Sequence, residues 1–211
     1  KLLGIITHDD IIDVVHDEAV EDAHLSAAVD PLDVSYLKTH LLTLSWKRGI
    51  WLIILFFCAL LTALALKHYQ ENLEKWIWLM PFIPLVISTG GNCGNQSATL
   101  IITALTRGHI KLSDWGRVVR RELLLGLLLG SVIGVMSYVP AGLLASNWRD
   151  ALVLPLTIVL VVVCGTLCGS LLPLLFKRLG LDPAMMSNPF VAGIIDILGI
   201  VIYMNVAFLI L

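Results

Sequence analysis

The stretch PLVISTGGNCGNQSATLIITAL, residues 84–105, decides how this chain folds. Its ends are apolar enough to cross a membrane, yet its middle contains two asparagines, a glutamine, three glycines and several hydroxyl side chains. Drawn as a helix, six polar side chains fall within an arc of about 100°, with the glycines opposite. The six are Ser88, Asn92, Asn95, Gln96, Thr99 and Thr103. The stretch therefore predicts a transmembrane helix with one polar face, which either lines a hydrated path or bonds to neighbouring helices.

The composition favours a membrane protein. Of the 211 residues, 58% are hydrophobic and only 14% are charged, and the mean hydropathy is +0.90. A soluble domain carries far more charge than this. Several apolar runs reach the roughly 20 residues that cross a hydrocarbon core. We predict an all-α membrane protein with five transmembrane helices, over roughly 49–66, 76–104, 123–144, 152–176 and 184–211.

The basic residues predict the orientation of these helices. With the N-terminal segment in the cytoplasm, only Lys67, Lys75 and Arg149 of the 14 Lys and Arg residues fall outside. The remaining basic residues then lie on the cytoplasmic side, as membrane proteins prefer. We therefore predict a cytoplasmic N-terminus and a C-terminus on the outside.

The last predicted span contains Asp196, the only acidic residue deep within any of the five. A carboxylate at that depth is costly, and by default it marks an ion or substrate path. Asn188, Ala192, Gly199 and Tyr203 fall on the same helical face, and the two small side chains leave room beside the carboxylate. Pairing of Asp196 with a basic residue is a weaker alternative, because no Lys or Arg lies deep in a span. A proton relay or Na⁺ coupling stays open.

One carboxylate per chain is few for a divalent cation, whereas two chains about a twofold axis supply two. Mg²⁺ commonly keeps several waters when one or two carboxylates bind it. Paired Asp196 side chains, with Asn188 amides and backbone carbonyls, would hold a hydrated Mg²⁺ through its waters, as carboxylate rings do in cation pores. These residues predict a homodimeric pore.

Nine of the 16 acidic residues lie within residues 1–33, most of them in one short predicted helix that Thr7 or His8 would begin. Like charges three or four residues apart repel each other along a helix. Bound divalent cations would relieve that repulsion. The segment is therefore either an ordinary solvated surface or a cation sensor.

Two further acidic residues have simpler explanations. Glu122 opens the third span beside Arg120 and Arg121, which predicts an ion pair at the membrane interface. Asp182 precedes Pro183, which is typical of an N-cap with proline at the first helical position.

The four cysteines do not indicate an active site. Cys164 and Cys168 stand one helical turn apart, but no His or second thiol pair accompanies them as in metal sites. Cys93 has no neighbouring base and lies in an apolar segment, which disfavours a nucleophile. We predict that the chain is not an enzyme, uses no organic cofactor and binds no nucleic acid.

Three segments together resemble one family. GGNCGNQSATLIITALTRG, residues 90–108, is similar to the second span of the MgtE-type magnesium channels. LGLDPAMMSNPFVAGIIDILGIVIYMNVA, residues 179–207, resembles their last span. LLGIITHDDIIDVVHDEAVEDAH, residues 2–24, resembles the end of their second CBS domain and the start of the connecting plug helix.

The resemblance implies a Mg²⁺-selective channel or transporter in the bacterial inner membrane, built from two identical chains. Its second and fifth helices would line the pore, with Asp196 as the central selectivity residue. The implied pore residues are Asn188, Ala192 and Gly199 on the fifth helix. From the polar stripe itself, we predict that Asn92, Asn95, Gln96 and Thr99 form a hydrogen-bonding wall beside the ion path. A Na⁺- or H⁺-coupled secondary transporter that uses Asp196 is the alternative.

The resemblance also implies gating by cytosolic Mg²⁺. It divides the chain into a CBS remnant at 1–24, the plug helix at 25–46 and the pore domain at 47–211. The regulatory Mg²⁺ would bind acidic residues at family positions, namely Asp10, Asp13, Glu18, Glu21, Asp22 and Asp182. Because nearly all of both CBS domains is absent from this sequence, we expect weaker inhibition by Mg²⁺ than in a full-length family member.

Overall fold

The computed structural model describes residues 4–5, 7–32, 35–185 and 188–211. Within these residues the fold is entirely helical, without a strand. Five helices are long and apolar enough to cross a membrane, which confirms the predicted all-α membrane fold. They are α2 (Leu41–His68), α4 (Ile83–Thr106), α5 (Trp115–Leu144), α6 (Val153–Arg178) and α7 (Asn188–Ile210).

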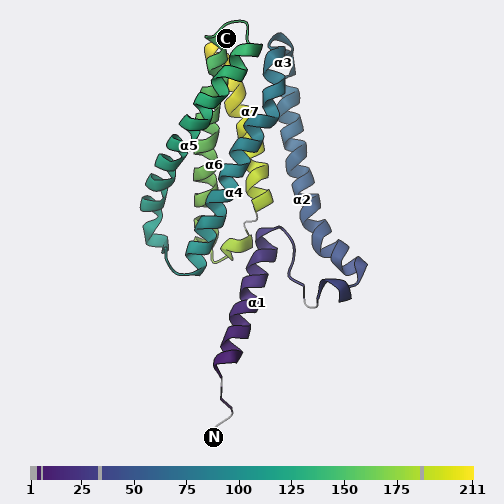
Figure 1. The fold of residues 1–211 in the computed structure, drawn as a ribbon. Helices are drawn as coiled ribbons and strands as arrows, with labels where there is room; N and C mark the ends of the chain where they lie inside the picture. Colours follow the sequence, from purple (N-terminus) through teal and green to yellow (C-terminus); the bar gives the residue numbers. More distant parts are fainter. Residues whose placement is uncertain (1–3, 6, 33–34, 186–187) are drawn as a thin grey trace.

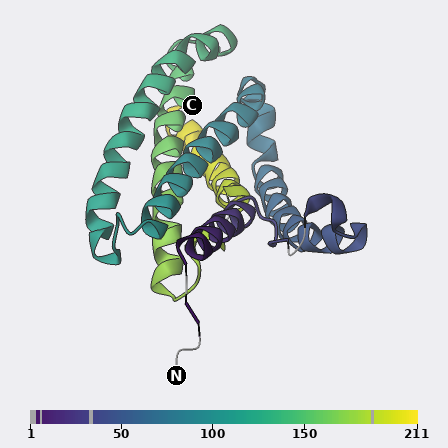
Figure 2. The same ribbon diagram turned by 60° about the horizontal axis from the view of Figure 1, so that its bottom comes forward.

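The long helices form one bundle, from which helix α1 (His8–Ser26) projects at the end opposite the C-terminus (Figure 1). Helix α6 packs against α4, α5 and α7, and α4 also packs against α7. Helix α2 packs mainly against α7, and none of its residues is buried. Figure 2 shows α2 and α5 on opposite sides of the bundle. The bundle therefore has α6 as its centre, with α2 at its edge.

Glycines let α6 approach its neighbours closely. A Cβ atom at Gly165 would lie 2.5 Å from the carbonyl oxygen of Gly90, and one at Gly169 would lie 2.1 Å from that of Gly94. Both helices thus use glycines four residues apart, a spacing that brings transmembrane backbones together. The glycines of the opening stretch are packing residues between α4 and α6.

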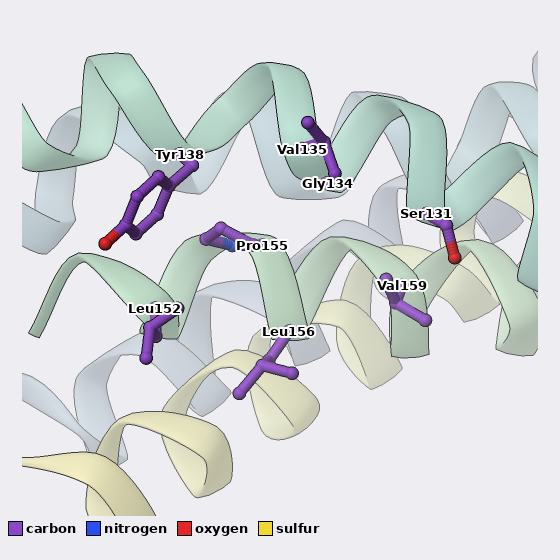
Figure 3. Close-up of a pocket in the computed structure, with 8 residues that line it drawn as sticks. All are labelled: Ser131, Gly134, Val135, Tyr138, Leu152, Pro155, Leu156 and Val159. Atoms are coloured by element: carbon purple, nitrogen blue, oxygen red, sulfur yellow. The ribbon is translucent and has the colours of Figure 1, made fainter. Parts of the chain in front are cut away.

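The contact between α5 and α6 leaves an apolar trough near the C-terminal end of α5. Its volume is about 240 Å³, and Gly134 and Pro155 face each other along it (Figure 3). The larger side chains of Val135 and Tyr138 line one side, on α5. This trough lies within the two spans and is lined by no charged side chain.

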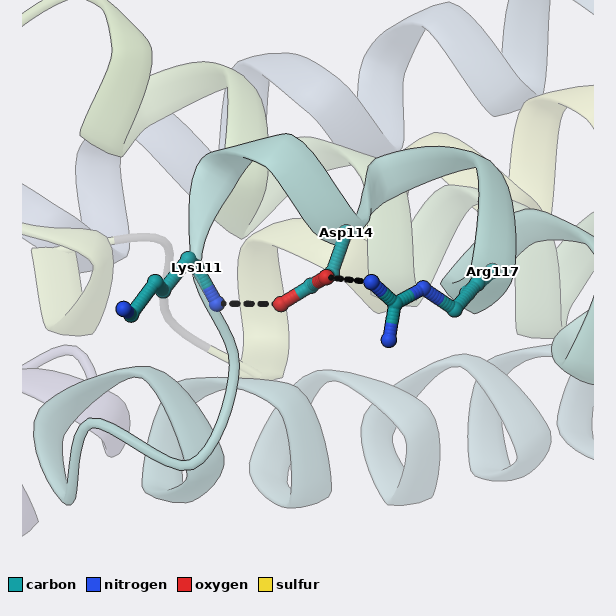
Figure 4. Close-up of polar contacts among 3 residues, drawn as sticks. All are labelled: Lys111, Asp114 and Arg117. Atoms are coloured by element: carbon teal, nitrogen blue, oxygen red, sulfur yellow. Dashed lines mark hydrogen bonds and ion pairs between the residues drawn. The ribbon is translucent and has the colours of Figure 1, made fainter.

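Short elements join the long helices. Gly108 and Gly180 follow α4 and α6 with φ of 68° and 76°, the left-handed conformation that commonly ends a helix. Asp114 organises the start of α5: its carboxylate accepts the Lys111 backbone N–H at 3.0 Å and pairs with Arg117 at 2.8 Å (Figure 4). The short elements are η1 (Tyr36–Lys38), α3 (Gln70–Lys75), η2 (Ile77–Phe82), η3 (Leu112–Asp114), η4 (Asp150–Leu152) and η5 (Pro183–Met185).

The N-terminal region differs from the sequence prediction. The expected helix at 25–46 does not form as one element, since α1 ends at Ser26 and α2 begins only at Leu41. Ala28 has φ of 58°, and the Val29 N–H donates to the His24 carbonyl at 3.0 Å, which closes the helix as a Schellman motif does. Pro31 follows within three residues and cannot continue a helix.

Two side chains tie the segment after α1 to the first span. The Trp51 Nε1–H donates to Asp30 Oδ1 at 3.0 Å, and Lys47 donates to the carbonyl oxygen of Pro31. At the start of the chain, Gly4 and Ile5 are exposed and have no regular structure. Of the CBS remnant that we expected at 1–24, residues 1–3 and 6 lie outside the described residues.

Candidate functional site

The polar stripe of α4 lies on the surface of the protomer. Five of its six polar residues are exposed: Ser88, Asn92, Gln96, Thr99 and Thr103. Asn95, at the edge of the stripe, is half-buried, and its side-chain oxygen has no hydrogen-bond partner. The glycines on the opposite side of α4 face the interior of the same protomer. Helix α4 is therefore amphipathic in the predicted sense, with its polar side turned away from its own bundle.

Asp196 lies against the backbone of α4. A Cβ atom at Gly91 would be 3.9 Å from Asp196 Oδ1 and 3.6 Å from the Ala192 Cβ. The two small residues thus make room for the carboxylate beside the polar stripe, next to Asn92. Within the described part of the chain, no basic side chain forms an ion pair with Asp196, which argues against the alternative of a structural ion pair.

Asn188 lies on the same face of α7 as Asp196, in the first turn of the helix. Its Nδ2 donates to Thr99 Oγ1 at 3.3 Å, so the first turn of α7 is joined to the stripe on α4. Asn188, Ala192 and Asp196 stand four residues apart and follow one side of α7. The structure brings these three predicted residues together with Thr99 and Gly91 along the contact between α4 and α7.

Gly199 and Tyr203 do not continue this face. Tyr203 is only 1% exposed, and its hydroxyl donates to the carbonyl oxygen of Leu79 at 3.1 Å. Gly199 is buried beside Val86 and Val161. A helical wheel gives the direction of a side chain but not what covers it. Here η2 covers Tyr203, and α4 and α6 cover Gly199, so both residues are packed within the protomer.

Glu122 corrects a second expectation. Among the described residues it forms no ion pair with Arg120 or Arg121, and it is buried inside the bundle, with 6% of its surface exposed. Its Oε2 accepts the Ser97 hydroxyl at 2.6 Å, and its carbonyl oxygen accepts the Thr166 hydroxyl at 3.2 Å. These bonds join α5 to α4 and α6. Ser97 was the available signal in the sequence, because it is a polar residue on the glycine side of α4 and needs a partner.

Glu122 therefore predicts a stability difference between two substitutions. We expect Glu122→Leu to lower the free energy of unfolding by about 1–3 kcal/mol, because the buried Ser97 hydroxyl loses its acceptor. Glu122→Gln keeps an acceptor oxygen at nearly the same place and should lose less. Thermal unfolding of the purified variants in detergent measures both. Equal stability of the two variants would contradict the buried hydrogen bond.

The acidic residues of α1 are mostly solvated. Asp10 accepts the Thr7 hydroxyl at 2.6 Å and the Thr7 N–H at 2.8 Å, and this capping lowers the pKa of Asp10. Asp13, Glu18 and Glu21 are exposed along the helix. In the described residues, no three His, Cys, Asp or Glu side chains come close enough together to hold a metal ion.

Asp22 is the acidic residue that meets the membrane domain. The end of α1 packs against η5, where Asp182 Oδ1 accepts the Ala184 N–H at 2.8 Å. Asp182 thus caps η5 and not α7, which begins only at Asn188. Partial burial raises the pKa of Asp22, and neighbouring carboxylates raise it further. Those carboxylates belong to Asp182, Glu18 and Glu21.

Comparison with known proteins shows similarity to one protein family. The family profile of MgtE, described as a divalent cation transporter, matches residues 83–206. Magnesium transporter MgtE of Thermus thermophilus is 41% identical over all of this chain and 47% of its own length. The proteins of that name from Enterococcus faecalis and Bacillus subtilis are 36% and 31% identical over 98% of this chain and 45% of theirs.

The chain thus spans about half the length of these relatives. The profile match covers the helices that carry the polar stripe and Asp196, and the relatives match the chain from end to end. With its five spanning helices it is a multi-pass membrane protein. It belongs to the MgtE family of divalent cation transporters.

Proposed function

We propose that two copies of this chain form a pore that passes hydrated Mg²⁺ across the cell membrane. The observation that carries the proposal is the Asp196 carboxylate, which lies beside Gly91 on a polar face without an ion-pair partner in the described residues. An unpaired carboxylate in a membrane span attracts a cation. The magnesium transporters among its relatives make Mg²⁺ the first ion to test.

A second copy would complete the site. The polar stripe of α4 is exposed in one protomer. Apart from bonds such as that from Asn92 to Ser88, hydrocarbon would offer its polar groups no partner, and each unpaired group costs several kcal/mol. Two such stripes about a twofold axis would enclose a hydrated path with two Asp196 carboxylates. We propose Asn92, Asn95, Gln96 and Thr99 as hydrogen-bond partners of the water around the ion.

Flux measurements test the proposal. Purified protein in liposomes should admit Mg²⁺ down its own gradient, at a rate that imposed Na⁺ and H⁺ gradients leave unchanged. Because a channel needs no coupling ion, uptake that follows either of those gradients would favour the secondary transporter instead. The absence of any Mg²⁺ flux above empty liposomes would overturn both.

We further propose that cytosolic Mg²⁺ closes the pore by fixing α1 against η5. With the N-terminus in the cytoplasm, α1 lies where that Mg²⁺ would reach it. Helix α1 then takes the role expected for the plug helix, at His8–Ser26 and not at 25–46. The approach of Asp22 to Asp182 supports this role, since a divalent cation between them would relieve their repulsion.

Substitution of Asp22 tests this coupling. Because the pKa of Asp22 is raised in the fold, protonation favours docking of α1. The stabilisation is complete below the ordinary pKa of 3.8 and is lost as pH rises through the raised pKa. We therefore expect Asp22→Asn to protect the amides of α1 from hydrogen exchange at pH 7 without Mg²⁺, as Mg²⁺ should do for the unsubstituted protein.

Asp17→Asn is the matched control for this experiment, because Asp17 is on the same helix with 88% of its side chain exposed. It should leave both the exchange and its Mg²⁺ dependence unchanged. If Asp22→Asn and Asp17→Asn behave alike, the repulsion at η5 does not control the docking of α1.

A further inference from the structure

A groove opens between the start of α5 and the end of α6. It has a volume of about 660 Å³. Leu112 and Trp115 line one side, Leu171 and Leu175 line the other, and Ser113 and Arg178 add polar groups at the helix ends. We call this the basic groove.

The walls of the basic groove suit hydrocarbon. Trp115 is 61% exposed, and Leu171 and Leu175 are 38% and 48% exposed, although both leucines belong to a membrane span. In a membrane, exposed leucines of a span would face acyl chains, and a tryptophan at the end of a span is typical of the membrane interface. An apolar chain of a lipid therefore fits these walls better than a soluble ligand does.

Arg178 supplies the charge. Among the described residues, its guanidinium has no ion-pair partner, whereas two other basic residues at this end of the bundle are engaged. Arg117 pairs with Asp114 (Figure 4), and Lys177 Nζ donates to the Leu105 carbonyl at 3.2 Å. A guanidinium binds phosphate through two parallel hydrogen bonds, and the exposed Ser113 hydroxyl provides a further donor.

We propose that the basic groove binds an anionic glycerophospholipid, with an acyl chain along the leucines and its phosphate at Arg178. Basic pockets between transmembrane helices bind such headgroups on the cytoplasmic side. The basic groove lies at the end of the bundle where the α4–α5 connection, the start of α5 and the end of α6 carry seven of the 14 Lys and Arg residues, namely Arg107, Lys111, Arg117, Arg120, Arg121, Lys177 and Arg178. The apolar trough near Tyr138 has no charged lining, so it provides an internal comparison.

Native mass spectrometry of the purified protein, with phosphatidylglycerol or phosphatidylcholine added to the detergent, tests the proposal. We expect phosphatidylglycerol to be retained more strongly. Arg178→Gln should weaken its binding about fivefold, the effect of one basic residue at an anionic lipid, and weaken the binding of phosphatidylcholine less, because that lipid has a phosphate but no net charge. Arg107→Gln is the matched control, because Arg107 is exposed at the same end of the bundle but does not line the groove.

A second pair of variants tests the apolar walls. Leu175→Trp fills the basic groove and should also weaken retention of phosphatidylglycerol. Leu156→Trp is its control, since Leu156 is 48% exposed on the same helix but lines the apolar trough. Leu171→Trp replaces Leu175→Trp if the latter does not fold.

Three results would overturn the proposal. The first is an equal loss of phosphatidylglycerol binding in Arg178→Gln and Arg107→Gln. The second is equal retention of phosphatidylglycerol and phosphatidylcholine by the unsubstituted protein. Cross-linking of two copies through Ser113→Cys would show that protein, not lipid, covers the groove.

Discussion

Asp196→Ala is expected to lower Mg²⁺ flux through the protein in liposomes at least about a hundredfold, because it removes the carboxylate that we propose as the site of the ion. Unit charges 4 Å apart interact by about 4 kcal/mol at the effective dielectric near protein surfaces, and a hundredfold change corresponds to about 2.7 kcal/mol. A divalent ion doubles the attraction, and intervening water weakens it, so the loss remains large. Mg²⁺-sensitive dye inside the liposomes measures the flux.

Two further variants separate the charge from the fold. Asp196→Asn keeps the volume beside Gly91 and removes the charge, so it should lose nearly as much flux as Asp196→Ala. Asn205→Ala removes an exposed polar group of the same helix, which donates only to the Val201 carbonyl of its own turn, and should keep its flux. If Asp196→Asn conducts like the unsubstituted protein, the carboxylate is not the site of the ion.

Much of the membrane domain could be predicted from sequence, because the hydrophobic length of a span and the angle of a side chain around a helix are local properties. The five spans follow from apolar run length. The exposed stripe of α4, with its glycines on the opposite side, follows from helical periodicity. The sequence places Ala192 and Asp196 on one face of α7, but it does not predict that Gly91 lies beside them.

The failures concern contacts that periodicity does not contain. Tyr203 belongs to the face of Asp196 on a wheel, yet η2 covers it in the fold. Glu122 has arginine neighbours in sequence, yet its partner is Ser97 on another helix. Helix α1 ends before Ala28, which adopts a left-handed conformation that alanine rarely takes. Only Pro31, further along the chain, signals in the sequence that the helix stops.

The close contact between α4 and α6 at Gly169 leads to the second large expected effect, a loss of stability. We expect Gly169→Ala to lower the free energy of unfolding by at least about 3 kcal/mol, the upper range for added atoms in a packed core. The new Cβ would lie 2.1 Å from the Gly94 carbonyl oxygen, which is a backbone atom, so α4 and α6 must move apart. Thermal unfolding in detergent, followed by tryptophan fluorescence, measures the loss.

Gly49→Ala is the control, and it should change the free energy of unfolding in the opposite direction. Gly49 also lies within a helix, α2, but a Cβ there would meet nothing within 4 Å. Alanine favours a helix by about 1 kcal/mol over glycine, so this variant should match or exceed the unsubstituted protein in stability. Similar stability of Gly169→Ala and Gly49→Ala would contradict the close crossing. Because that crossing also holds Gly91 beside Asp196, Gly169→Ala should lose Mg²⁺ flux together with stability, whereas Gly49→Ala should keep both.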